Sequence, residues 1–260
     1  MQKIVWCFMA VLLFSCDSEK KEQPPIVESQ TAVVPRKKKE EAPPVVEFPF
    51  LNNDNCEAFL TTYGQENPEN KVRIKTSFGN IVVRLFDDTP LHRANFIYLV
   101  KREYFNPTEI VRIIKGFVIQ GGNSERMLAE QKRFIIGQYT IPSEISVNHP
   151  HYSGALAMSR SYENNPEKRS SAYDFYIVHG KKATNAEIYD ATQRKDWKYP
   201  AAHVEHYRKQ GGTMHLDGQH TVFGEVISGM DVVNTIANLP TDGSDWPKEY
   251  VEVNMEIVTD

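Results

Sequence analysis

The run Ile110-Val111-Arg112-Ile113-Ile114-Lys115-Gly116-Phe117-Val118-Ile119-Gln120-Gly121-Gly122 is the most informative part of the chain. It is apolar and rich in β-branched residues, as expected of a strand, yet it contains one arginine and one glutamine. Reading from Arg112 with period two, Ile114 and Gly116 lie on the same side, and Gly116 permits a bend before Phe117. A charged side chain on an apolar sheet face is costly unless it is paired or has a function there. Arg112 is therefore the first candidate site residue.

Further segments on both sides of this run carry recognisable motifs. Upstream stands Ser77-Phe78-Gly79-Asn80, between two alternating segments that predict a β-hairpin, and then Arg93-Ala94-Asn95-Phe96. Downstream, the chain contains Gly154-Ala155-Leu156-Ala157-Met158-Ser159, Asp174-Phe175-Tyr176-Ile177 and Leu216-Asp217-Gly218-Gln219-His220-Thr221-Val222-Phe223-Gly224. In this order, and together with the first run, these segments resemble the cyclophilin-type peptidyl-prolyl isomerases. The resemblance extends over roughly Val72 to Thr259.

The resemblance implies a mainly β fold and a specific site. The fold would be a closed antiparallel eight-stranded barrel capped by two helices. The family positions imply three catalytic residues, Arg112, Phe117 and Gln120, with Arg112 as the donor to the proline nitrogen. The substrate-binding positions would be Val118, Ser159, Asp174, Tyr176, His215, Leu216 and His220. No cofactor, metal, nucleotide or covalent intermediate is needed for this reaction.

The sequence departs from the family at three matched positions. Asp174 stands where most members have a glutamine, His215 where the best-studied eukaryotic members have a tryptophan, and Val111 where they have a histidine. A carboxylate near a guanidinium can capture it in an ion pair, so Asp174 either competes with substrate for Arg112 or orients it. We favour competition. The alternative functions are a weakly active peptide-binding or chaperone module and a mainly structural envelope protein, the latter without a supporting motif; Arg112 could also be a purely structural, salt-bridged residue.

The N-terminus predicts export and lipidation. Lys3 precedes an apolar segment from Ile4 to Phe14, which has the length of a secretory signal and is too short to span a bilayer. Leu13-Phe14-Ser15-Cys16 resembles the lipobox of bacterial lipoproteins, although a plain signal peptide with an incidental cysteine is the alternative. We expect residues 1–15 to be a signal peptide, Cys16 to be the lipidated N-terminus, and residues 16–54 to be a flexible tether. The protein would then face the periplasm or the cell surface as a lipoprotein of the cell envelope.

Composition limits the partners. The chain has 260 residues, is 40% hydrophobic and has a net charge of -4, so no charge excess indicates a nucleic-acid partner. The basic run at 36–39 is followed directly by two glutamates, which favours a solvated charge run. Three cysteines, two of them within the first 16 residues, exclude a disulfide framework. The expected partners are proline-containing segments of exported proteins and, through the anchor, a membrane; we expect a monomer.

Helical signals divide the rest of the chain. Residues 55–70 predict a helical lead-in, capped by Asn55 or Asp54 and stopped by Gly64, before an isomerase domain over 71–260. Two more helices are predicted from Pro90 to near Tyr104 and from 229 to 239. An insertion at about 181–210, with helices near 185–193 and 201–209, has no counterpart in a minimal cyclophilin. It is either a surface decoration or a wall beside the substrate groove.

Histidine pairs raise the question of a metal. His149 with His151, and His203 with His206, have spacings that a metal could use. No further Cys or His cluster joins them, and His203-Val204-Glu205-His206 is not the zinc-protease pattern. We interpret all four as loop and helix-surface histidines and expect no metal site.

Overall fold

The computed structural model describes residues 48–259. Alternating apolar residues produce its first hairpin, because Val72 and Ile74 of β1 (Lys71–Thr76) and Ile81 and Val83 of β2 (Gly79–Leu85) point to the same buried side. The strands pair in antiparallel register across the turn at residues 77–78. The predicted hairpin is thus present.

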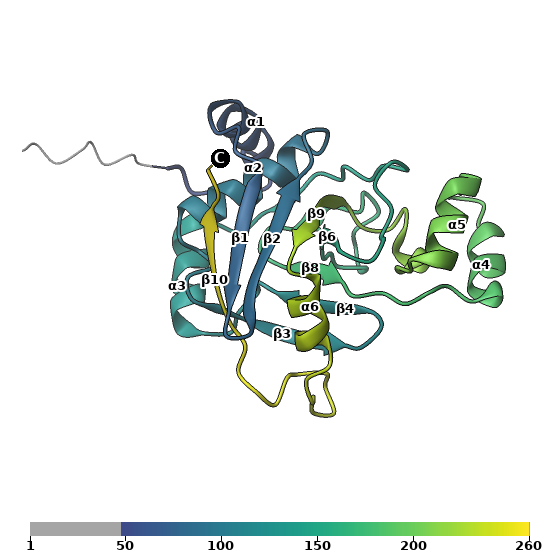
Figure 1. Ribbon diagram of the computed structural model, residues 1–260. Helices are drawn as coiled ribbons and strands as arrows, with labels where there is room; N and C mark the ends of the chain where they lie inside the picture. Colours follow the sequence, from purple (N-terminus) through teal and green to yellow (C-terminus); the bar gives the residue numbers. More distant parts are fainter. Residues whose placement is uncertain (1–47, 260) are drawn as a thin grey trace, which may run out of the picture. The chain divides into compact units, whose positions relative to one another are not determined.

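Eight antiparallel strands close into a barrel in the order β1-β10-β3-β4-β8-β6-β9-β2 (Figure 1). The remaining barrel strands are β3 (Thr108–Ile114), β4 (Val118–Gly121), β6 (Ala155–Met158), β8 (Phe175–Val178), β9 (Val222–Ser228) and β10 (Glu252–Ile257). A separate small sheet pairs β5 (Thr140–Ile141) with β7 (Ser170–Ser171). Closure leaves no edge strand in the barrel. The predicted fold class is confirmed.

Both predicted capping helices are present. They are α2 (Pro90–Lys101), which begins at its proline, and α6 (Met230–Ala237). Phe96 of α2 lies in the main core, with its ring centroid 5.3 Å from that of Phe223 and 5.8 Å from that of Phe175. The core therefore lies inside the barrel and beneath α2.

The N-terminal lead-in differs from its prediction at both ends. Helix α1 (Cys56–Glu66) continues past Gly64, where a Cβ would lie 3.0 Å from that of Ala94 on α2. Gly64 permits close helix packing and is not a stop. Asn55 occupies the N-cap position, but its side chain accepts a hydrogen bond from the Asn52 backbone and caps no helical N–H.

The boundary between the tether and the folded domain also differs from its prediction. Leu51 is fully buried, and its backbone N–H donates to the Ile136 carbonyl. Phe48 packs on Tyr98, with ring centroids 5.3 Å apart. The end of the tether predicted at residue 54 therefore lies too far along the chain, while the predicted signal peptide, Cys16 and the tether up to residue 47 lie outside the described residues.

One helix was not expected from the sequence. In α3 (Met127–Ile136) only Ala129 and Ile136 are buried, while Met127 and Phe134 are 74% and 80% exposed. The helix has no apolar stripe that faces the core, so the spacing of apolar residues in this part of the sequence does not distinguish a helix from a loop.

The insertion forms two helices, α4 (Asn185–Thr192) and α5 (Ala201–Lys209), which lie beside each other at one side of the barrel (Figure 1). Thr184 and Glu187 form a capping box at the start of α4. The chain then returns to the barrel through the short 3-10 helix η1 (Met214–Leu216). No helix within residues 48–259 is long and apolar enough to cross a bilayer.

Candidate active site

Strand register brings the predicted polar and aromatic residues into one row. Arg112 of β3 is paired with Gln120 of β4, Gln120 with Tyr176 of β8, and Tyr176 with Ala157 of β6. Directly paired residues have Cβ atoms about 4.5–5.5 Å apart on one face of the sheet. The arginine, the glutamine and the tyrosine therefore share one face of the barrel wall.

The same strands bury both of their faces. Along β8, Phe175 and Ile177 belong to the main core, whereas Tyr176 and Val178 belong to a second apolar cluster. This cluster also contains Val118 and Leu216, with Phe117 packed against it. The sequences of these strands are continuously apolar because one face of the sheet fills the barrel and the other forms an apolar cup.

A cavity of about 380 Å³ lies on this cup. Its lining includes every site residue predicted from the sequence, together with Arg160 and Tyr162. The predicted residues that line it are Arg112, Phe117, Val118, Gln120, Ser159, Asp174, Tyr176, His215, Leu216 and His220. The cavity thus combines an apolar cup with a polar rim.

The guanidinium of Arg112 has a partner that the sequence did not indicate. Its Nε lies 3.4 Å from the carboxylate of Asp245, and both side chains are about 40% exposed (41% and 42%). The backbone N–H of Ile113 also donates to the Asp245 carbonyl, so this loop is attached to β3. An exposed ion pair of this kind contributes only about 0–1 kcal/mol, so substrate can displace it.

Asp174 is bound to Gln120 and not to Arg112. The Gln120 side-chain amide donates to Asp174 Oδ1 at 2.9 Å and to Ser159 Oγ at 3.3 Å. The direct Arg112–Asp174 ion pair considered in the sequence analysis is absent from the ion pairs of residues 48–259. Burial raises the pKa of Asp174 to about 6, although the Gln120 hydrogen bond and the charge of Arg112 act in the opposite direction.

His220 closes one end of the cavity as a neutral side chain. Its Nδ1 lies 3.2 Å from the Met158 carbonyl, which only accepts, so Nδ1 carries the proton. The hydroxyl of Tyr162 then donates to Nε2 at 2.7 Å. Burial, and secondarily the neighbouring His151, lowers the pKa of His220 to about 4. Arg160 stacks over the Tyr162 ring, 4.2 Å from its centroid.

A buried polar chain supports Tyr176 from behind. The Tyr176 hydroxyl lies 2.9 Å from His151 Nε2, and His151 Nδ1 lies 2.8 Å from the Asp217 carboxylate. Tyr207 of α5 donates to the other oxygen of Asp217 at 2.6 Å. His151 is 1% exposed, so its interpretation as a surface histidine was wrong. Each of its ring nitrogens already has a protein partner.

The other three histidines lie where the sequence analysis expected. His149 pairs with Asp88 on the surface, and His203 and His206 lie on α5, where His206 stacks on Tyr152. Within residues 48–259 no group of three His, Cys, Asp or Glu side chains is placed to hold a metal ion.

Sequence analysis missed Arg160, Tyr162 and Asp245. Arg160 and Tyr162 directly follow the Gly154–Ser159 motif, so a search just beyond the end of that strand would have found them. Asp245 lies more than a hundred residues from Arg112 in an irregular loop, and no local pattern identifies it.

Comparison with known proteins places this site in a family. A family model described as "Cyclophilin type peptidyl-prolyl cis-trans isomerase/CLD" matches residues 71–257. The chain belongs to the cyclophilin-type peptidyl-prolyl cis-trans isomerases. The family and the isomerase activity that the sequence predicted are thereby confirmed.

Two bacterial relatives illustrate the relationship. A Staphylococcus aureus protein provisionally named a peptidyl-prolyl cis-trans isomerase is 31% identical over 186 residues, covering 71% of this chain and 89% of the relative. A Streptococcus pyogenes protein provisionally named a bifunctional phosphatase/peptidyl-prolyl cis-trans isomerase is 34% identical over 184 residues. That match covers 70% of this chain but only 37% of the streptococcal protein.

A solved structure shares the fold. The cyclophilin-type isomerase of Cryptosporidium parvum aligns with a TM-score of 0.52 and 22% identity, over 74% of this chain and 99% of that chain. A second structure of that protein was determined in the presence of the dipeptide Ala-Pro, with a TM-score of 0.51 and 23% identity.

Proposed function

We propose that this cyclophilin accelerates rotation about X-Pro bonds in exported proteins and thereby assists their folding. The observation that supports it best is the convergence of all ten predicted site residues on one cavity of about 380 Å³. Rotation about the bond before proline faces a barrier of about 18–20 kcal/mol and takes tens to hundreds of seconds without a catalyst. Proline-containing segments are the proposed substrate class, and Ala-Pro accompanies a structural relative.

In the proposed mechanism the apolar cup holds the proline ring while the rest of the amide turns. Twisting the C–N bond removes its resonance and leaves a lone pair on the proline nitrogen. A guanidinium donor binds this twisted state better than the planar state, which lowers the barrier. Arg112 is the donor, released from Asp245 when substrate enters. Gln120 holds the substrate backbone or orients Arg112.

The test is an isomerisation assay on a fragment of residues 47–260, whose described part, residues 48–259, is compact. An Ala-Pro peptide is followed by NMR exchange between its cis and trans forms, with and without the protein. Acceleration in proportion to protein concentration supports the proposal. Peptide binding without acceleration would favour the alternative, a weakly active binding or chaperone module. The Asp245 partner of Arg112 and the Asp174 partner of Gln120 are the observations that keep this alternative open.

We further propose that the protein acts from a membrane surface, anchored by acyl chains on Cys16. The lipobox-like Leu13-Phe14-Ser15-Cys16 supports this proposal. Each buried methylene of an acyl chain contributes about 0.8 kcal/mol, so two or three chains anchor a protein firmly. Cys16→Ser should move the protein from the membrane to the soluble fraction, whereas Cys56→Ser, which changes a buried cysteine of the domain, should not. Membrane fractionation of Cys16→Ser would contradict lipidation at this residue.

A further inference from the structure

A second, larger cavity adjoins the proline site. Its volume is about 560 Å³, and it lies between the turn that joins β3 to β4, the inserted helix α4 and the segment that leads into η1. Phe117 and His215 line both cavities, and their rings stack with centroids 5.2 Å apart. The two cavities thus share this pair of rings as a common border.

The wall that α4 supplies is fixed to the rest of the protein. Ile188 and Ala191 of α4 pack with Tyr207 and Met214 in an apolar cluster. The insertion is closed at its base by a bridge between Lys181 and Gly212. The insertion therefore forms one wall of the cavity that adjoins the candidate site, an arrangement that favours the wall interpretation over that of a surface decoration.

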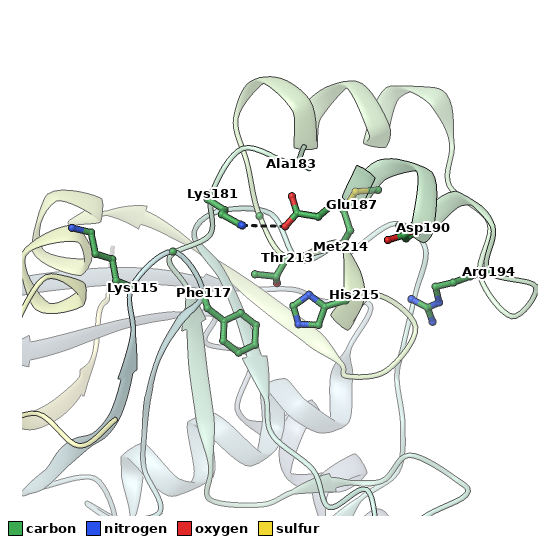
Figure 2. Close-up of a pocket in the computed structure, with 13 residues that line it drawn as sticks. Lys115, Phe117, Lys181, Ala183, Glu187, Asp190, Arg194, Thr213, Met214 and His215 are labelled. Carbon is green, nitrogen blue, oxygen red and sulfur yellow. Dashed lines mark ion pairs between the residues drawn. The ribbon is translucent and has the colours of Figure 1, made fainter. Parts of the chain in front are cut away.

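One buried polar atom faces this cavity without a partner. Thr213 is 5% exposed and lines the cavity, and its Oγ1 has no hydrogen bond within the described residues. Figure 2 shows Thr213 between the Lys181–Glu187 ion pair and the rings of Phe117 and His215. Burying a hydroxyl without a partner is costly, so this atom indicates a ligand that supplies one.

The charges at the cavity leave one carboxylate unpaired. Lys181 lies 3.1 Å from Glu187, and Arg194 is engaged by Asp196 and by a backbone carbonyl. Lys115 extends away from the cavity (Figure 2). Asp190 lies on the α4 wall, and across residues 48–259 its carboxylate forms no hydrogen bond or ion pair. Lys115 has no ion pair within residues 48–259 either, but it extends away from the cavity (Figure 2), so the unpaired charge on the α4 wall of the cavity is negative.

We propose that this cavity is a substrate subsite that binds a lysine or arginine side chain close to the isomerised proline. The proposal rests on the proposed isomerase function and names its substrate preference. An extended chain advances about 3.3 Å per residue, so a residue within about three positions of the proline reaches past the Phe117–His215 pair. Its aliphatic stem would lie along Ala191 and Met214, as long cationic side chains do on apolar surfaces.

The charged end of that side chain would meet Asp190, and Thr213 would donate its hydroxyl to a peptide carbonyl. An acidic side chain would instead face the unpaired carboxylate of Asp190. A purely apolar side chain would pack on Ala191 and Met214 but leave the carboxylate of Asp190 without a partner. The subsite therefore discriminates by charge as well as by length.

The experiment uses the full chain purified in detergent and peptides with a central Ala-Pro. One residue, up to three positions from the proline on either side, is set to Lys, norleucine or Glu. At one of these positions Lys should give a kcat/KM about threefold above that of norleucine, since exposed ion pairs contribute about 0.2–1 kcal/mol, or 1.4- to 5-fold. Glu should fall below norleucine. Equal values at every position would overturn the proposal.

Asp190→Asn should bring the Lys-to-norleucine ratio close to one, and Asp190→Lys should make Glu the preferred residue. Glu130→Gln is the matched control, because Glu130 is also an exposed helical carboxylate, on α3, and should leave the ratio unchanged. A preference for Lys that survives both Asp190 variants would overturn the subsite.

A failure of the proposed isomerase function can be distinguished from a failure of the proposed subsite. If no Ala-Pro peptide is turned over, the same peptides are titrated by NMR. Weaker binding of the Lys peptide to Asp190→Asn than to the parent chain would retain the subsite, and equal binding would overturn it.

Discussion

The proline cavity and the neighbouring cavity share Phe117 and His215 but are built in different ways. The first is centred on the paired strands β3, β4 and β8, whose register brings Arg112, Gln120 and Tyr176 together. The second is closed by a helical insertion, whose position depends on packing between segments distant in sequence. The difference suggests that the first cavity carries the chemistry and the second selects the substrate.

The largest effect is expected at the strand-built cavity. Arg112→Ala should lower kcat/KM by at least tenfold and by as much as about 1,000-fold, since loss of one transition-state donor costs about 2.7–4 kcal/mol, or about 100- to 1,000-fold, in well-studied sites. The fold should be unchanged by circular dichroism. The ratio of Lys to norleucine peptides should also stay the same, because that preference lies in the other cavity.

Arg73→Ala is the matched control for Arg112→Ala. Arg73 also lies on the barrel surface, is 36% exposed and pairs with a carboxylate, that of Glu256. It should retain full turnover. Unchanged turnover in Arg112→Ala would remove Arg112 from the mechanism.

The strand-built site could be predicted because its determinants are local. Arg112, Phe117 and Gln120 lie within nine residues, and a hairpin with a bend at Gly116, where φ is 77°, brings them to one cavity. Short motifs therefore encode both the register and the site.

The remaining features depend on distant segments. Asp245 reaches Arg112 from a loop near the C-terminus, and His151 becomes buried only because Asp217 and Tyr176 surround it. The N-terminal helix passes Gly64 because Ala94 packs against it. None of these contacts follows from periodicity or composition.

The insertion should contribute to stability more than to chemistry. Tyr207→Phe removes the donor to the buried Asp217 carboxylate, whose loss should lower the free energy of unfolding by about 1–3 kcal/mol. Denaturant titration measures this change. Tyr189→Phe, on the exposed side of α4 at 64% exposure, should be neutral. Equal stability of the Tyr207 variant and the parent would mean that the buried hydrogen bond from Tyr207 to Asp217 does not stabilise the attachment of the insertion to the barrel.

The smallest effect concerns Asp174, where this cyclophilin departs from its family. The structure changes the expected route of competition, because the Asp174 carboxylate holds Gln120 and not Arg112. Asp174→Gln replaces a charge-assisted hydrogen bond with a weaker neutral one and frees Gln120 for the substrate backbone. We expect kcat/KM to rise about threefold at pH 7.5, which corresponds to less than about 1 kcal/mol.

The rise in kcat/KM expected for Asp174→Gln should depend on pH. Because burial raises the pKa of Asp174 to about 6, its side chain is mostly neutral at pH 5, and the variant should then differ little from the parent chain. Asp231→Asn, on the exposed first turn of α6, should show no such dependence. A fall in kcat/KM at pH 7.5 would mean that Asp174 orients the site instead of competing within it.

Stability gives an independent check on the same residue. An unfolded aspartate titrates near about 3.9, so the folded value is raised. Both states are protonated below about pH 4, and the cost of the buried charge develops as pH rises through about 6, where stability is lost. Asp174→Gln lacks this cost. Its melting temperature should therefore exceed that of the parent by more at pH 7.5 than at pH 4, and an equal difference at both values would mean that Asp174 is not buried as a charge.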